Sequence, residues 1–369
     1  MMERKELGII GKLLVFVLTL LALVGLVAMA MSVVNGYVDP KRFVWTSVLG
    51  LGFWVIFIFN VLVFIALLML RSRRAWVALL ALAVSVPGIA KSYSFGRKSD
   101  DTLSLRVMSY NVHNFKHVDG TTSVEDCAND IIGFVREKNP DILCCQEFAG
   151  FMPKVHRNKC IEIFAEESGF QYVYYNQKRN YAGNVIFSKF PIAKVDVKSG
   201  FGSENTYGVM VEVDAGEKGR FFVANVHLLS YNITDNEIDQ LVSSSERRNS
   251  LDTIGMTVLR KLKYATMQRS EQIVTMLEGL PETDAPVVVC GDFNDPPLSY
   301  TYRQMQKAGF VDMFTKVGWG IKPTYAGKLP LLRIDYIWGD KNIKPLDFKR
   351  FRHKSSDHYP ITLDFKITQ

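Results

Sequence analysis

The sequence predicts an α/β protein in which transmembrane helices are followed by two mixed sheets packed face to face, with helices outside. Three observations predict it. Long uncharged runs fill residues 1–100, strand-like and helical segments alternate from about residue 103, and the strand-like segments outnumber the helical ones and often follow one another directly. A doubly wound parallel sheet would instead alternate strand and helix throughout. We therefore divide the 369 residues into a membrane anchor, 1–100, and a folded domain, 101–369.

The anchor contains three hydrophobic runs, at roughly 9–34, 44–70 and 75–92. About 20 apolar residues suffice for a helix to cross a hydrocarbon core. A cleaved signal peptide has a single short apolar core, which three successive runs do not fit. The third run is the shortest and contains Pro87, so a re-entrant or interfacial helix is the alternative there.

Basic residues predict the orientation of the anchor. The Lys and Arg of "ERK" and "RSRR" are expected to stay in the cytoplasm. With three spans, residues 101–369 then lie on the extracytoplasmic (periplasmic) side. The basic residues of the first outer loop (41–42) and those after the third run (91–98) oppose this orientation.

The distribution of charge gives little support for a nucleic-acid-binding protein, and the cysteine content gives little support for a disulfide-rich or zinc-binding one. Of the 44 Lys and Arg, 11 lie in residues 1–100, together with 4 of the 37 Asp and Glu, so residues 101–369 carry 33 of each sign. The net positive charge therefore lies in the anchor, and it is weak evidence for a nucleic-acid partner, because a basic binding face should lie on the folded domain. The five cysteines show no spacing typical of a disulfide framework or a zinc site.

The folded domain is expected to alternate short strands with a few helices. Apolar runs bounded by turn residues predict strands, and helical apolar spacing that ends at Pro or Gly predicts helices. The strands are expected at 103–113, 141–147, 182–192, 207–214, 219–229, 285–294, 333–339 and 357–367, and the helices at 124–140, 158–170, 267–280 and 299–310.

Residues 230–266 are a long polar stretch that ends in a possible helix over 251–266. Such long connections are functional or disordered more often than not. A surface helix packed on the sandwich is one interpretation. The other is a lid or a membrane-facing helix that admits the substrate.

Polar side chains stand at the end of nearly every predicted strand. They are Asn111, Glu147, Asn225, His227, Asp292, Asn294, Asp335, Asp357 and His358. Carboxylate and amide oxygens suit Mg²⁺ or Mn²⁺, and histidines suit proton transfer near neutral pH. Any one of these strand ends, such as "CGDFNDPP", could be ordinary turn chemistry, but six in one chain indicate a site.

The motifs "GDFN" and "SDHYPI", supported by "QE", "NVHL" and "RIDYIW", resemble the endonuclease/exonuclease/phosphatase superfamily, the DNase-I-like metal-dependent phosphoesterases. The resemblance covers roughly residues 103–367. It implies a four-layered α/β sandwich and hydrolysis of a phosphodiester or phosphomonoester. Metal-assisted, in-line attack of water is the implied reaction, with Mg²⁺ or Mn²⁺ as the cofactor.

The resemblance also implies roles for the strand-end residues. Glu147 would be the principal metal ligand with Asn111 beside it, and Asp357 would bind metal or orient His358. Asn225, Asn294 and His358 would contact the phosphate, and Asp292 the attacking water. His227 would stabilise the phosphoryl oxygens or protonate the leaving group, supported by Asp335. The chemistry allows either Asp292 or His358 as the general base.

Four further polar residues are expected to be ordinary surface positions. His113 and His117 follow the first strand and are interpreted as solvated loop residues. Arg269 and Gln272, one helical turn apart, are interpreted as a surface face. Cys144 and Cys145 are interpreted as core residues.

The substrate does not follow from the fold. The membrane anchor favours a lipid headgroup, because tethering raises the local concentration of enzyme at a bilayer. A membrane-anchored nuclease acting on nucleic acid is the alternative, and a catalytically inactive binding module is a third. Beyond the lipid bilayer itself, no obligate protein partner is evident.

Overall fold

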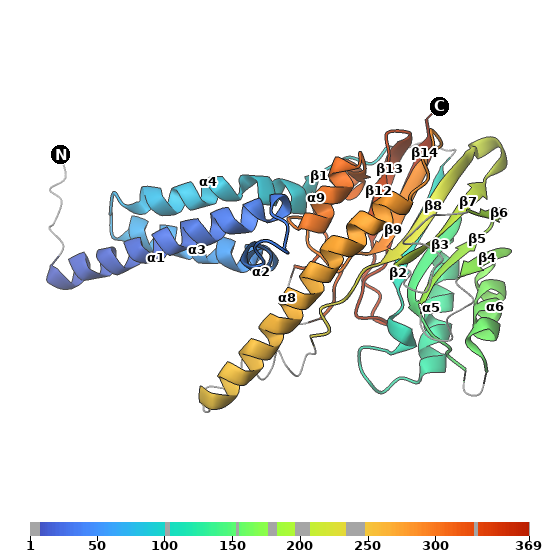
Figure 1. The fold of residues 1–369 in the computed structure, drawn as a ribbon, viewed down its shortest axis with the longest axis horizontal. Coiled ribbons are helices and arrows are strands. Elements are labelled where there is room, and N and C mark those ends of the chain that lie inside the picture. Colours follow the sequence, from blue (N-terminus) through green and yellow to red (C-terminus); the bar gives the residue numbers. More distant parts are fainter. Residues whose placement is uncertain are drawn as a thin grey trace. The chain divides into compact units, whose positions relative to one another are not determined.

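The computed structural model describes residues 8–99, 104–152, 155–175, 183–195, 207–233, 248–327 and 331–368, with side chains from 255 onward in the sixth range. The chain divides into two compact units, which we describe separately (Figure 1). One is helical and comprises Met1–Lys91 with Pro296–Arg303. The other is the α/β unit, Ser92–Asp295 with Gln304–Gln369.

The helical unit contains α1 (Ile9–Val34), α2 (Trp45–Leu51), α3 (Phe53–Met69) and α4 (Ala75–Ser92). Two helical stretches, Ile9–Tyr37 and Ala75–Ser92, are long and apolar enough to cross a membrane. The run at 44–70 is not one straight helix, because it breaks at Gly52 into α2 and α3, which are bent by 72°. Counted as one span, this pair brings the number to three.

Small and polar residues bring the first and third helices together. The Asn60 side-chain amide donates to the carbonyl oxygen of Gly25 at 3.2 Å and to that of Ile56 at 2.8 Å. A β-carbon on Gly25 would lie 2.5 Å from Asn60 Oδ1, so a larger residue there would displace the Asn60 side chain. Close contacts at small residues with interhelical hydrogen bonds are typical of helices that pack within a bilayer.

The α/β unit contains two six-stranded mixed sheets, which confirms the expected sandwich. One sheet has the order β13-β14-β2-β3-β5-β4 and the other β10-β12-β9-β8-β7-β6. The first sheet consists of β13 (Ile343–Arg350), β14 (Ile361–Ile367), β2 (Leu105–Asn111), β3 (Ile142–Phe148), β5 (Gly183–Ser188) and β4 (Tyr172–Tyr175). The second consists of β10 (Val311–Asp312), β12 (Asp335–Gly339), β9 (Val287–Asp292), β8 (Arg220–His227), β7 (Gly208–Asp214) and β6 (Ile192–Lys194).

The remaining elements of this unit surround the sheets or join their strands. The helices are α5 (Val124–Lys138), α6 (Arg157–Ser168), α8 (Arg248–Gly279), the second half of α9 (Tyr300–Lys307), whose first half belongs to the helical unit, and the short α10 (Phe314–Val317). A separate antiparallel pair joins β1 (Tyr93–Phe95) to β11 (Trp319–Ile321). Helix α8 is continuous where the sequence predicted two helices at 251–266 and 267–280. Part of the long polar stretch, 234–247, lies outside the described residues.

Alternation along the strands divides the core in two. On β3, Cys144 faces the other sheet and packs in a cluster that includes Val223 and Val288. Its neighbour Cys145 faces the opposite way, in a cluster with Ile131 of α5 and Phe164 of α6. Both cysteines are buried and free, as expected of core residues.

Strand direction brings the polar strand ends to one place. Strands β2 and β3 run parallel, with Asn111 opposite Gln146. In the second sheet, β8 and β9 also run parallel, and Asp292 lies opposite both His227 of β8 and Asp335 of β12. Since both sheets present these ends to the same side, the side chains predicted to form a site converge.

Gly291 of the "GDFN" motif is required by the approach of β8 to β9. Its φ is +142°, and a β-carbon there would lie 1.9 Å from the carbonyl oxygen of Val226. A strand glycine of this kind marks close approach of another backbone. Any side chain would have to push β8 away from β9.

We therefore expect Gly291→Ala to lower the free energy of unfolding by about 2–5 kcal/mol, the combined effect of overpacking and backbone strain. The measurement is thermal unfolding of the detergent-solubilised protein. Gly309→Ala is the matched control, because Gly309 also has a positive φ (+88°) but nothing lies within 4 Å of its β-carbon position. Equal losses for the two variants would contradict the steric explanation.

Candidate active site

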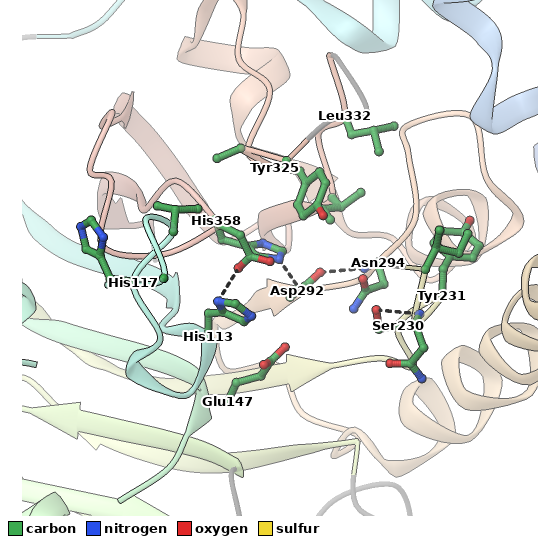
Figure 2. A pocket seen from close by; sticks show the side chains of 18 residues that line it. His113, His117, Glu147, Ser230, Tyr231, Asp292, Asn294, Tyr325, Leu332 and His358 are labelled. Atoms are coloured by element: carbon green, nitrogen blue, oxygen red, sulfur yellow. Dashed lines mark hydrogen bonds and ion pairs between the residues drawn. The ribbon is translucent and has the colours of Figure 1, made fainter. Parts of the chain in front are cut away.

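The converging strand ends open into a cavity of about 770 Å³ (Figure 2). Five of the predicted site residues line it: Glu147, Asp292, Asn294, Asp357 and His358. Asn111 and Asp335 are buried and hydrogen-bonded directly to lining residues. His227 does not line the cavity, but its Nε2 lies within 4 Å of the lining residues Glu147 and Asp292. The structure thus brings the predicted residues together, with Asn225 as the exception described below.

Asn111 joins carboxylates from both sheets. Its side-chain NH₂ donates to Glu147 Oε1 at 3.1 Å and to Asp292 Oδ2 at 3.0 Å. Its Oδ1 accepts from the backbone N–H of His113 at 3.0 Å. Because this N–H can only donate, it fixes the amide so that the NH₂ faces the carboxylates. In this arrangement Asn111 holds Glu147 and Asp292 in place.

Two carboxylates flank the imidazole of His358. Nδ1 lies 2.9 Å from Asp335 Oδ2, and Nε2 lies 3.6 Å from Asp292 Oδ2. Burial opposes the imidazolium, but Asp335 and Asp292 outweigh this and raise the pKa of His358 well above its usual value. The pKa of Asp292 is raised to about 6 by burial and the negative charge of Asp335, although His358 opposes the rise.

His227 reaches the same carboxylates from β8. Its Nε2 lies 3.6 Å from Glu147 Oε1 and 3.8 Å from Asp292 Oδ2, too far for hydrogen bonds. This buried nitrogen has no hydrogen-bond partner among the described residues. Burial raises the pKa of Glu147, but His227 and the Asn111 hydrogen bond more than offset it, so the pKa is below its usual value.

Backbone strain marks the site. Glu147 and Asn294 have left-handed φ values of +51° and +53°, and His113, Asn114 and Phe115 form a run of positive φ. Such conformations cost about 1–3 kcal/mol each for ordinary residues. The ladder between β3 and β5 shifts register between Cys145 and Phe148, and this irregularity contains Glu147.

The run after β2 contains site residues that the sequence interpretation missed. His113 and His117 are partly exposed loop residues, as expected, but they also line the cavity, which the sequence interpretation did not predict. His113 Nδ1 lies 3.6 Å from Asp357 Oδ1. Asn114 donates to Glu147 Oε2 at 2.9 Å. The motif "HNF" could have indicated this run of positive φ, because Asn and His tolerate positive φ better than most residues.

Asn225 does not line the cavity. Its NH₂ donates to the carbonyl oxygens of Cys145 (2.7 Å) and Val185 (2.9 Å) in the other sheet, and its Oδ1 accepts from Gln146 Nε2 at 2.7 Å. The side chain is fully buried. The expected contact with phosphate is therefore replaced by a tie between the two sheets.

The interpretation of Arg269 as a surface residue was also wrong. Arg269 is 0% exposed and forms an ion pair of 2.8 Å with Asp295. Gln272, one turn further along α8, accepts from the backbone N–H of Leu229 at 2.9 Å. The face of α8 that carries both residues is directed at the loops next to the site.

The donor groups fit a divalent cation. Ligand atoms of Asp292, Asp335 and His358 lie within 4.8 Å of one another, but Asp335 already accepts a hydrogen bond from His358. Glu147 and Asp357 add carboxylates at the cavity wall. Hard oxygen donors facing a polar cavity suit Mg²⁺ or Mn²⁺ better than softer metals.

Comparison with known proteins is consistent with this geometry. A family model described as "Endonuclease/Exonuclease/phosphatase family" matches residues 108–358, and a model of a domain of unknown function (DUF8431) matches residues 12–92. No curated protein matches the chain.

Solved structures match about 72% of the chain at low sequence identity. An endonuclease/exonuclease/phosphatase from Beutenbergia cavernae DSM 12333 is 17% identical, with 72% of each chain covered and a TM-score of 0.50. The human Nocturnin catalytic domain with bound sulfate is 18% identical, with 72% of this chain and 95% of that chain covered and a TM-score of 0.48. D. rerio TDP2 complexed with single-strand DNA product is 14% identical, with 72% and 100% covered and a TM-score of 0.47.

The raised pKa of Asp292 predicts a pH-dependent effect of Asp292→Asn. The carboxyl group favours folding in its protonated form, so its contribution is complete below about pH 4 and is lost as the pH rises through about 6. Between pH 4 and pH 8, the stability of the variant relative to the natural protein should therefore improve by about 1–3 kcal/mol. Thermal unfolding in excess chelator at the two pH values measures it, and a pH-independent difference would contradict the assignment.

Proposed function

Because the chain belongs to the endonuclease/exonuclease/phosphatase family, we propose that residues 101–369 are a divalent-metal-dependent phosphoesterase tethered to a membrane and acting on a lipid headgroup. The observation that carries the proposal is the convergence of Glu147, Asp292 and His358, with His227 beside them, on one cavity. These are the residue types that hold a cation, move a proton and contact a phosphate.

Glu147 would hold the cation, with Asp357 on the facing wall as the second carboxylate. A bound Mg²⁺ or Mn²⁺ would neutralise negative charge on the phosphate and lower the pKa of water. Asn111 would act by fixing Glu147 and Asp292, since its NH₂ donates to both. This differs from the direct ligation that the resemblance implies for Asn111.

His358 would contact the phosphate, and Asp292 would act on the attacking water. Asp335 accepts from His358 Nδ1 and favours the imidazolium, so the Nε2–H of His358 can donate to a phosphoryl oxygen. Asp292, the less basic of the two but deprotonated near neutral pH, would orient or deprotonate the attacking water. His227, with Nε2 free of hydrogen bonds among the described residues, would stabilise the phosphoryl oxygens or protonate the leaving group.

The described walls of the cavity favour a single phosphoester joined to an apolar group. Val118, Tyr325, Leu332 and Ile334 line it, and no Lys or Arg does so among the residues described. A nucleic-acid strand carries a row of phosphates whose binding draws on basic side chains. Apolar lining with a few convergent polar groups is instead typical of sites for small, partly apolar ligands.

We propose that the catalytic domain lies outside the cytoplasm, since the helical unit supplies up to three spans and basic residues flank the first run and precede α4. A reporter enzyme fused after Gln369 should then be active only outside the cytoplasm, and one fused after Arg74 only inside. A C-terminal reporter active in the cytoplasm would place the substrate in the inner leaflet.

The substrate class is tested with the detergent-solubilised full chain and added Mg²⁺ or Mn²⁺. The probes are bis(p-nitrophenyl) phosphate, p-nitrophenyl phosphate, plasmid DNA, and vesicles that contain sphingomyelin or phosphoinositides. We expect turnover of the generic diester and of a lipid, and its loss in excess chelator. Faster cleavage of plasmid DNA would favour the nuclease alternative, and activity unaffected by chelator would exclude the metal mechanism.

In the same assay, Glu147→Gln should raise the metal concentration needed for half-maximal turnover by at least about 10-fold. Mutating a residue that only supports a metal ligand already lowers metal affinity by about 10-fold, and the loss of a ligand's own charge should lower it at least as much. Glu162→Gln is the matched control, since Glu162 is an exposed residue of α6 paired with Lys159.

A further inference from the structure

Helix α8 places a buried arginine where the loops that follow β8 and β9 meet. Arg269 Nη1 donates to the carbonyl oxygen of Leu229 at 2.7 Å, and Nη2 donates to Asp295 Oδ1 at 2.8 Å. The guanidinium carbon lies 4.0 Å from the centroid of the Tyr231 ring. One side chain therefore contacts a backbone carbonyl, a carboxylate and an aromatic face from two separate loops.

The two loops carry the site. The backbone N–H of Leu228 donates to the carbonyl oxygen of Asp292 at 3.0 Å, and Asn294 Nδ2 donates to the carbonyl oxygen of Leu228 at 3.0 Å. Tyr231 and Asn294 both line the cavity (Figure 2). Each loop begins directly after a residue of the proposed reaction, His227 in one case and Asp292 in the other.

Neighbouring groups hold the same two loops and leave little freedom at this junction. The Tyr231 hydroxyl donates to Asp295 Oδ1 at 3.0 Å, and the Tyr336 hydroxyl donates to the carbonyl oxygen of Asp295 at 2.7 Å. Gln272 fixes the N–H of Leu229, as described above. With its carboxylate bound by Arg269 and Tyr231, Asp295 anchors the left-handed backbone of Asn294.

Stability alone is a weak explanation for this ion pair. Taking both charges out of water costs several kcal/mol per ion, and well-packed apolar residues of similar volume often stabilise a core as well or better. An arginine offers instead a planar fork of donors with fixed directions. This geometry suits the joining of two loops at a set separation.

We propose that Arg269 is a positioning residue, which fixes the loops after β8 and β9 so that His227 and Asn294 face the same phosphate and Tyr231 forms a wall of the cavity. The proposal rests on the phosphoesterase function for its kinetic consequence. Its structural consequence, a clamp between two loops, is independent of any substrate.

The first test is hydrogen exchange on the full chain in detergent. In Arg269→Lys, which keeps the charge but loses the fork, the amides of 228–232 should exchange at least about 10-fold faster, because exchange reports local opening. Arg106→Lys is the matched control. Arg106 also makes a forked pair, to Asp364, and donates to a backbone carbonyl, but it lies at the other end of β2 from Asn111.

The second test is the steady-state kinetics of bis(p-nitrophenyl) phosphate with Mn²⁺. We expect Arg269→Lys to lower kcat by about 10–100-fold with little change in KM, since small misplacements of reacting groups act on the transition state. Added guanidinium should partly restore kcat in Arg269→Ala. Arg106→Lys should keep kcat within about 3-fold, even where its thermal stability falls as far as that of Arg269→Lys.

The outcomes separate the two proposals. If the natural protein hydrolyses none of the phosphoesters, the proposed function fails. Amide hydrogen exchange of 228–232 in Arg269→Lys then still tests whether Arg269 holds the two loops together. If the natural protein is active and Arg269→Lys keeps its turnover and its exchange pattern, Arg269 is not a positioning residue. Should Arg269→Lys fail to fold, the kinetics are measured on Gln272→Met and on Tyr231→Phe instead. Each keeps Arg269 but removes one neighbouring hydrogen bond of the same two loops. Unchanged kcat in both of these variants would overturn the proposal.

Discussion

The buried carboxylate of Asp292 is the constraint on which the rest of the site depends. It lies on a central strand with His227 and Asp335 as its neighbours in register, and it is 1% exposed. An isolated carboxylate at such a position would cost several kcal/mol, or would take up a proton. The Asn111 amide, the N–H of Asn294 and the nearby imidazole of His358 offset part of this cost. Each of them is thereby fixed in position, so burying one charge orders much of the site.

The same constraint explains why two sheets are needed. Asn111 and Glu147 come from the first sheet, and Asp292 from the second, so the site exists only while the sheets keep their spacing. Asn225 secures that spacing, since it donates from the second sheet to two backbone carbonyls of the first. A buried amide with every donor used is a specific tie, because any shift of one sheet would leave polar groups unsatisfied.

Much of the fold, and most of the side chains that the structure brings to the candidate site, could be predicted from the sequence, because both depend on local patterns. Apolar runs ending in Asn, Glu, Asp or His correctly gave β2, β3, β8 and β9 with their terminal side chains. Several short or edge strands, including β4 and β13, were not predicted. Strand β13 contains Pro345 and exposed charges, which hide its period of two. The place of His113 at the cavity and the burial of Arg269 were missed for a different reason: whether a loop or helix residue faces solvent is decided by elements far away in sequence. The bend between α2 and α3 likewise had no signal stronger than a single glycine.

Helix α8 holds a wall of the cavity beside the candidate site. Arg269 and Gln272 hold the start of the loop after β8, and Lys261, two turns earlier on the same helix, donates to the carbonyl oxygen of Asn232 at 2.8 Å. The helix therefore contacts the described part of this loop, 228–233, at Leu229 and at Asn232, and the wall formed by 230–233 depends on the position of α8. His227 and Asp292 stand on strands that are fixed by their ladder, with the buried Asp292 placed in register between His227 and Asp335. Residues of α8 that contact 230–233 can thus alter the cavity wall, whereas Arg269 also acts on the loops that begin after His227 and Asp292.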